Sequence, residues 1–117
     1  MTPTTSFAIA LGVFLAMIYF LFVRRGSISG AVAKQLVEDG ARLVDVRSPA
    51  EYASGHIPGA INIPVQELSD RIGELAPNDK PIVLYCQSGM RSASAVRFLK
   101  AAGYERVHNL GAMRSWG

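Results

Sequence analysis

The sequence is poor in side chains that bind metals or form disulfides. Its 117 residues include one cysteine, Cys86, and two histidines. A single cysteine excludes an intrachain disulfide framework and any site built on a cluster of cysteine ligands. Two histidines and one cysteine at these spacings match no metal-ligand pattern, so we expect no metal. One free thiol suits a reducing compartment.

Charged side chains are missing from the N-terminal part, where none precedes Arg24. The formal net charge is +3, and Arg24 and Arg25 supply two of the positive charges. From Gly26 onward the chain carries 10 basic and 9 acidic residues, so this part is nearly neutral. A nearly neutral chain without further runs of basic side chains gives no reason to expect a nucleic-acid partner.

A run of 17 residues without charge, Phe7 to Val23, fills most of the N-terminal part. As a helix this run would be about 25 Å long, which lies within the range of membrane-spanning segments. We therefore predict one N-terminal transmembrane helix, with residues 1–25 as the anchor and residues 26–117 as the following domain. A cleaved signal peptide is the alternative, but the run lacks a basic n-region and is longer than a usual h-region.

The flanks and one face of this predicted helix indicate an orientation and a partner. Arg24 and Arg25 follow the run, so the positive-inside rule places the following domain in the cytoplasm. Ala8, Gly12 and Ala16 recur every four residues and form one smooth face. Such a face allows close helix–helix contact and predicts a weak helix-mediated dimer, although small residues are also common in membrane helices generally.

Beyond Gly26, short apolar runs alternate with helical patterns. The predicted strands are Leu43–Val46, Ala60–Ile63, Ile82–Tyr85 and Arg106–Asn109. Four helices are predicted. The first follows Ser29 as its N-cap, and the second begins in a capping box at Ser48 to Glu51. The third runs from Val65 to Leu75, and the fourth runs from Ser92 to Ala102. Strands that alternate with helices through short turns predict an α/β domain whose parallel sheet is flanked by helices.

The one cysteine lies between the third predicted strand and the last predicted helix. Ligands of open parallel sheets bind beyond the carboxyl ends of strands, and Cys86 leaves such an end. A helix N-terminus and a nearby cation, here Arg91, lower the pKa of a thiol and so favour the reactive thiolate. Gly89 lets the backbone between them curl, so that its N–H groups can surround an anion. The alternative is that Cys86 is a small buried hydrophobe.

A second group of polar side chains follows the first predicted strand. We expect Asp45 to be a buried acceptor for loop N–H groups. Arg47 either guides an anionic substrate or pairs with Glu51 as a structural clamp, and the sequence leaves both interpretations open. His56 lies in a turn, where a neutral imidazole that holds the loop together is a more frequent arrangement than acid–base catalysis.

Several segments, in the same order, resemble the rhodanese-like sulfurtransferase family. Cys86 to Ser92 is similar to the active-site loop of that family, and Leu43 to Arg47 is similar to its first core strand with an Asp-x-Arg ending. The other matching residues are Glu51-Tyr52, Gly55 to Pro64, Gly103-Tyr104, Gly111 to Met113 and Trp116. The resemblance covers about Ser29 to Trp116.

The resemblance implies a rhodanese-like fold and a sulfurtransferase. Cys86 would be the catalytic nucleophile, which takes a sulfane sulfur from thiosulfate or a persulfide and passes it to a thiol or protein acceptor. No cofactor would be needed. The substrate-binding residues would be those of the loop together with the two arginines: Gln87, Ser88, Gly89, Met90, Arg91 and Arg47.

Two other functions remain as alternatives. Phosphatases related to this fold have a Cys-x5-Arg loop, whereas Cys86 and Arg91 form a shorter Cys-x4-Arg loop that suits a single persulfide sulfur. A membrane-tethered binding or regulatory module without turnover is the second alternative, but such modules have lost the cysteine that this chain keeps.

Overall fold

The structure is a computed structural model of the chain. It describes residues 3–24 and 26–117, and it describes the side chains of residues 6–19 and 26–117. In chain order the elements are α1 (Pro3–Arg24), α2 (Gly30–Glu38), β1 (Arg42–Asp45), α3 (Pro49–Ala53), β2 (Ile61–Asn62), η1 (Val65–Glu67), α4 (Leu68–Arg71), η2 (Ile72–Leu75), β3 (Ile82–Cys86), α5 (Met90–Ala101), β4 (Val107–Ala112) and η3 (Met113–Trp116), where η marks a 3₁₀ helix.

The four strands form one parallel sheet in the order β2-β1-β3-β4. The predicted α/β domain with a parallel sheet flanked by helices is therefore confirmed. β4 extends beyond its predicted end at Asn109, because its pairing with β3 continues past a shift in register until Ala112 lies opposite Cys86. β2 keeps only two of its four predicted residues.

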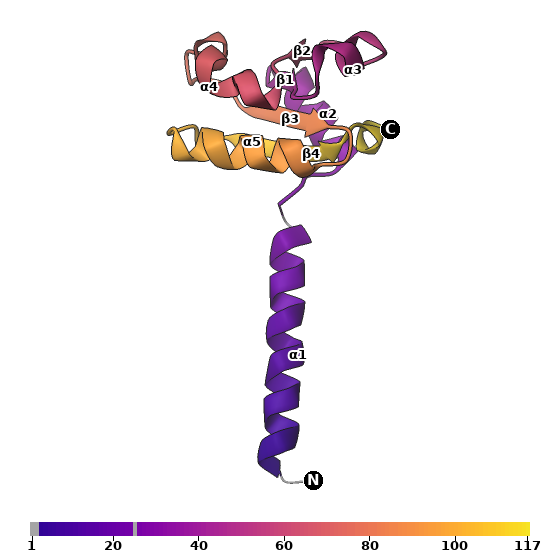
Figure 1. Ribbon diagram of the computed structural model, residues 1–117, viewed down its shortest axis with the longest axis vertical. Coiled ribbons are helices and arrows are strands. Elements are labelled where there is room, and N and C mark those ends of the chain that lie inside the picture. Colours follow the sequence, from indigo (N-terminus) through magenta and orange to yellow (C-terminus); the bar gives the residue numbers. More distant parts are fainter. Residues whose placement is uncertain (1–2, 25) are drawn as a thin grey trace.

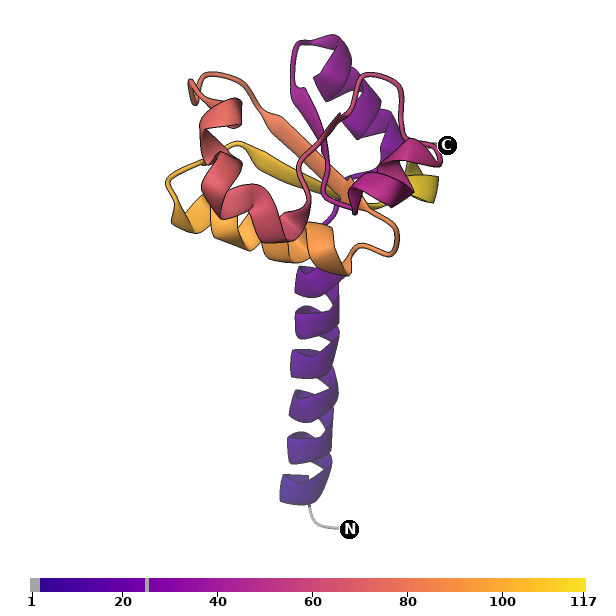
Figure 2. The same ribbon diagram turned by 45° about the horizontal axis from the view of Figure 1, so that its top comes forward.

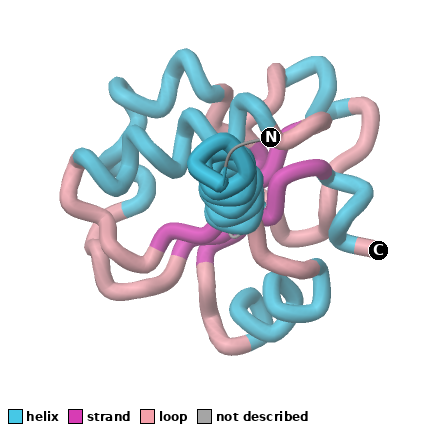
Figure 3. The backbone as a smooth tube through the Cα atoms, turned by 90° about the horizontal axis from the view of Figure 1, so that it is seen from below, coloured by secondary structure: helices cyan, strands magenta, loops and turns pink. Residues whose placement is uncertain are grey.

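Both faces of the sheet are buried, and the side chains of β3 alternate between them. Ile82, Leu84 and Cys86 belong to a core that also contains side chains of α4 and α5. Val83 and Tyr85 belong to a second core, which contains side chains of α2 and η3. Figure 3 shows the strands crossing the middle of the domain with helices on either side. Burial on both faces explains why β3 is a continuous apolar run.

The helix caps follow the predicted signals in two places. The Ser29 hydroxyl accepts the N–H of Val32 at the start of α2. Ser48 and Glu51 form the predicted capping box at the start of α3. The helix expected from Val65 to Leu75 is instead divided into η1, α4 and η2, and Gly73, which has low helix propensity, lies in the tightened last turn.

The helix α1 extends away from the α/β domain (Figure 1). Its described side chains, from Ser6 to Tyr19, are exposed, and most of them are apolar. Within the described part of the chain, no helix is long and apolar enough to cross a membrane. The described side chains cover only about 20 Å of helix, against a hydrocarbon core of roughly 30 Å.

The predicted transmembrane helix over residues 1–25 is therefore not supported by the structure. The rest of the uncharged run, Phe20 to Val23, and the pair Arg24-Arg25 lie outside the described side chains. The small-residue face of Ala8, Gly12 and Ala16 is exposed, and the dimer that it suggests stays a prediction.

Candidate functional site

The strand order has a topological switch point between β1 and β3, where successive connections lead to opposite sides of the sheet. From β1 the chain moves outward to β2, and from β3 it moves to β4 on the other side. The carboxyl ends of β1 and β3 are neighbours, because Asp45 lies opposite Tyr85. In doubly wound sheets ligands bind at such a switch point. Arg47 and Cys86 both follow it, as the sequence predicted, and Figure 2 shows the loop after β3 turning back into α5.

The sulfur of Cys86 lies under the N-terminus of α5 and accepts backbone hydrogen bonds. The N–H of Gly89 lies 3.0 Å from Sγ, and the N–H of Ser92 lies 3.4 Å from it. The Ser92 hydroxyl is 3.5 Å from the same sulfur. Gly89 can turn the backbone here because it adopts φ +101°, which disfavours any side chain. Since Gly89 is the N-cap, α5 begins at Met90, two residues before the predicted start at Ser92.

The pKa of Cys86 reflects two opposing effects. The residue is buried, and burial raises the pKa of a thiol. Hydrogen bonds from the Ser92 hydroxyl and from the backbone N–H groups of Ser92, Gly89 and Ser88 lower it. The hydrogen bonds outweigh the burial, so the pKa of Cys86 lies below its ordinary value. The site therefore stabilises the thiolate more than water does for a free thiol, and the alternative of an inert buried hydrophobe does not account for these donors.

Arg91 lies in the first turn of α5 and forms a two-pronged ion pair with Glu51 of α3. Its Nη1 lies 2.7 Å from Oε1, and its Nη2 lies 3.0 Å from Oε2. About a third of each side chain is exposed. The hydrogen bond from Arg91, followed by the N–H of Ser48, lowers the pKa of Glu51 to about 2. The guanidinium near the cysteine is thus already paired with a carboxylate.

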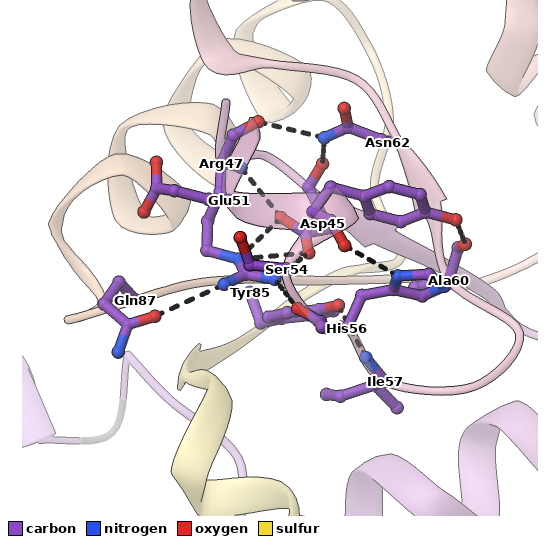
Figure 4. Close-up of polar contacts among 12 residues, drawn as sticks. Asp45, Arg47, Glu51, Ser54, His56, Ile57, Ala60, Asn62, Tyr85 and Gln87 are labelled. Carbon is purple, nitrogen blue, oxygen red and sulfur yellow. Dashed lines mark hydrogen bonds and ion pairs between the residues drawn. The ribbon is translucent and has the colours of Figure 1, made fainter. Parts of the chain in front are cut away.

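Arg47 has neither of the two predicted arrangements, which are contact with an anionic substrate and an ion pair with Glu51. It does not pair with Glu51, and it is only 3% exposed, so it does not face incoming substrate. Its Nε and Nη2 donate to the carboxylate of Asp45, at distances from 2.8 to 3.1 Å. Nη2 also donates to the carbonyl of Gly55, and Nη1 donates to Oε1 of Gln87 at 3.3 Å. Figure 4 shows these contacts around the Arg47 guanidinium.

The buried position of Arg47 is explained by the carboxylate of Asp45, two residues earlier in the chain. Asp45 is fully buried, and its carboxylate also accepts the backbone N–H of Arg47 at 2.9 Å. The prediction of Asp45 as a buried acceptor for loop N–H groups agrees with this bond. A buried carboxylate requires a counter-charge, and the guanidinium two residues further on supplies it. Arg47 therefore neutralises Asp45 and contacts the loop after β3 through Gln87. Its burial does not favour the predicted contact with substrate.

His56 holds the loop between α3 and β2, as the sequence indicated. Its Nδ1 lies 2.9 Å from the carbonyl of Tyr52, so that nitrogen carries the donated hydrogen. The imidazole also stacks on the Tyr52 ring, with 3.7 Å between the ring centroids. The Tyr52 hydroxyl donates to the carbonyl of Ala60 and connects both sides of this loop. His56 thus has a structural role.

The remaining predicted site residues lie in the loop after β3 and at the start of α5. Gln87 and Ser88 are exposed, and Met90 is 80% exposed at the first position of α5. The sequence analysis gave Ser92 no role of its own and considered Glu51 only as a partner of Arg47, whereas the structure brings both residues to the site. The signal for Ser92 is a hydroxyl within one helical turn of the loop glycine. The capping box marks Glu51 in the sequence, but no local signal identifies its pairing with Arg91, which is 40 positions away.

Metal ligands are not gathered at this site. Within the described residues, no three histidine, cysteine, aspartate or glutamate side chains are grouped in a way that could hold a metal ion. The groups at the site are a thiol, backbone N–H donors, a hydroxyl and two arginine–carboxylate pairs. This set is suited to stabilising a negatively charged sulfur nucleophile.

Known proteins share both the sequence and the fold of the domain. The uncharacterized protein YqhL of Bacillus subtilis is 45% identical over 78 residues, which are 66% of this chain and 61% of YqhL, so the match spans less than two thirds of that relative. The human thiosulfate:glutathione sulfurtransferase is 38% identical over 96 residues, 69% of this chain and 83% of the relative. The solved structure of the human single-domain sulfurtransferase TSTD1 is 37% identical, with a TM-score of 0.65, over 78% of this chain and 94% of that one.

Both the human relative and the human solved structure carry the name sulfurtransferase. The family model described as the rhodanese-like domain matches residues 26–117, which include the whole sheet and the loop with Cys86. Because the match covers most of the chain and its cysteine stands at the switch point of the parallel sheet, the chain belongs to the rhodanese-like domain family.

Proposed function

We propose that this protein moves a sulfane sulfur from thiosulfate or a small persulfide, through a persulfide on Cys86, to a thiol acceptor. The observation that carries the proposal is the sulfur of Cys86, which accepts the N–H groups of Gly89 and Ser92 and has a lowered pKa. An anionic sulfur with fixed donors is the group that attacks and then carries a sulfur atom.

In the first step, the Cys86 thiolate attacks the outer sulfur of the donor. A new sulfur–sulfur bond forms to Sγ while the sulfur–sulfur bond of thiosulfate breaks. Sulfite is the leaving group and takes the electron pair of the broken bond. In the second step, an acceptor thiolate attacks the outer sulfur of the Cys86 persulfide. The bond to Sγ breaks, the acceptor leaves as a persulfide anion, and the Cys86 thiolate is regenerated.

The residues around the sulfur have separate roles in this proposal. The N–H groups of Gly89 and Ser92, which lie 3.0 and 3.4 Å from Sγ, stabilise negative charge on the sulfur during the transfer. Arg91 lies at the edge of the loop as its fixed cation. Met90, which is exposed at the first position of α5, offers an apolar contact to the organic part of a persulfide or thiol.

The test is a steady-state sulfur-transfer assay on the full chain, with thiosulfate as donor and a small thiol as acceptor. Because donor and acceptor react in turn with the same cysteine, we expect ping-pong kinetics, with parallel lines in double-reciprocal plots. Intersecting lines would contradict a covalent carrier. Absence of transfer from both thiosulfate and a low-molecular-weight persulfide would contradict the proposal as a whole and favour a binding module.

For the N-terminal segment we propose attachment of the domain to a membrane, with the domain on the cytoplasmic side. The support is the uncharged run from Phe7 to Val23 followed by Arg24 and Arg25, together with the exposed apolar side chains of α1. We expect the chain to sediment with membranes at high salt, and we expect the domain to resist an impermeant protease in intact cells. Recovery in the supernatant, or digestion in intact cells, would contradict this proposal.

A further inference from the structure

The charge of Arg91 at the edge of the loop is offset by its partner. Both terminal nitrogens of the Arg91 guanidinium bond the Glu51 carboxylate, at 2.7 and 3.0 Å. The pair stands where the N-terminus of α5 meets α3, and about a third of each side chain is exposed. An incoming donor therefore meets a cation and an anion side by side, in place of an isolated cation.

Glu51 is held at this place by its own helix as well. Its Oε1 accepts the backbone N–H of Ser48 at 3.1 Å, and the Ser48 hydroxyl accepts the N–H of Glu51 at 3.2 Å. The capping box thus fixes the carboxylate before any contact with Arg91 is considered. Since its pKa is about 2, Glu51 carries its negative charge throughout the pH range of an assay.

We infer that Glu51 is a specificity-determining residue, which disfavours dianionic sulfur donors relative to monoanionic ones. This inference rests on the sulfur transfer proposed above. The repulsion between a carboxylate and a donor grows in proportion to the charge of the donor. Thiosulfate carries two negative charges, whereas the persulfide of an uncharged thiol carries one. The Glu51 carboxylate therefore repels thiosulfate twice as strongly as it repels the persulfide. This repulsion cancels the preference for the dianion that the Arg91 cation alone would create.

The experiment compares two donors on the full-length wild type and on Glu51→Gln. Glutamine keeps the capping box, because its side-chain oxygen can still accept the N–H of Ser48. It removes the charge and one of the two acceptors of Arg91, because an amide nitrogen cannot accept the hydrogen of Nη2. The donors are thiosulfate and the persulfide of 2-mercaptoethanol, which is a monoanion. The quantity is kcat/KM for each donor, which in ping-pong kinetics does not depend on the acceptor.

We expect the ratio of kcat/KM for thiosulfate to that for the persulfide to rise about five-fold in Glu51→Gln. The rise should shrink at high ionic strength, since partly exposed charges are screened by salt. Glu74→Gln is the matched control. It removes the same charge from another partly exposed pair, Arg71–Glu74, whose residues belong to α4 and η2, and it should leave the ratio unchanged.

Other outcomes would overturn the inference. If Glu51→Gln slows both donors equally, Glu51 only supports α3. If both variants shift the ratio alike, the effect comes from net charge and not from the site. A wild type that transfers sulfur from neither donor overturns the proposed function and this inference with it, whereas active variants with an unchanged ratio overturn this inference alone.

One measurement on the wild type needs no variant. Because the Arg91 charge is offset by Glu51, kcat/KM for thiosulfate should change little between low and high salt. A steep fall with salt would mean that Arg91 attracts donors as an uncompensated cation, and it would contradict the role of Glu51.

Discussion

Incubation of the full chain with thiosulfate is expected to raise its intact mass by one sulfur atom. Cys86 is the only thiol in the chain, so the added sulfur has one possible carrier and no second cysteine can release it as an intrachain disulfide. Its sulfur accepts the N–H groups of Gly89 and Ser92, which also stabilise the charge of a persulfide. The measurement is mass spectrometry after removal of excess donor, and a thiol reductant should restore the original mass.

Cys86→Ser is the control for this result. The variant should take up no sulfur, and its transfer rate should fall on the order of 10³-fold or more, to the background rate, because the covalent step is lost. Uptake of sulfur by Cys86→Ser, or no uptake by the wild type, would contradict the assigned nucleophile.

The rate of sulfur uptake should also depend on pH in a defined direction. The thiolate is the attacking form, so the rate is lost as the pH falls through the pKa of Cys86. Hydrogen bonds from Ser92, Gly89 and Ser88 outweigh burial and hold this pKa below its ordinary value of 9.0. The midpoint of the pH–rate profile should therefore lie below 9.0. A midpoint above it would mean that burial dominates at the sulfur.

Arg47→Leu is expected to destabilise the domain by about 3–5 kcal/mol, because it leaves the Asp45 carboxylate buried without its counter-charge. Asp45 is fully buried, and its ion pair with Arg47 is shielded from water. Typical domains are stable by only about 5–15 kcal/mol, so this loss is a large share of the total. The measurement is the free energy of unfolding of the full chain in denaturant, compared with the wild type.

Arg91→Leu is the matched control, since it also removes the arginine of a two-pronged ion pair. Its partner Glu51 is about one third exposed, so water can replace the lost donors and the loss of stability should be much smaller. Replacing Asp45 and Arg47 together by leucine should recover part of the stability lost in Arg47→Leu. Equal losses in Arg47→Leu and Arg91→Leu would contradict the distinction between the buried and the exposed pair.

The two arginines differ because of where their carboxylate partners lie. In the sequence, Arg91 is the expected cation of the loop, and Arg47 is a candidate either for contact with an anion or for a pair with Glu51. In the structure, Arg47 bonds Asp45 inside the protein, while Glu51 bonds Arg91 across 40 positions of sequence. The position of each arginine along the chain does not distinguish these pairings, since they depend on which strand and helix ends are neighbours.

The sequence by itself determined the elements and the chemistry of the loop. The apolar run Ile82 to Tyr85 marked a strand buried on both faces, and Gly89 marked the turn that follows Cys86. Ser48 and Glu51 marked a capping box that the structure contains. These features depend on contacts between residues a few positions apart, so local composition is enough to predict them.

Only the tertiary structure decided the strand order β2-β1-β3-β4, and with it the site. That order makes β1 and β3 neighbours and brings Arg47, Glu51 and the Cys86 loop to one edge of the sheet. It also placed the Ser92 hydroxyl beside the sulfur of Cys86. The physical reason is that strand pairing and burial are summed over the whole domain, whereas a sequence pattern reports only the preference of each segment for helix or strand.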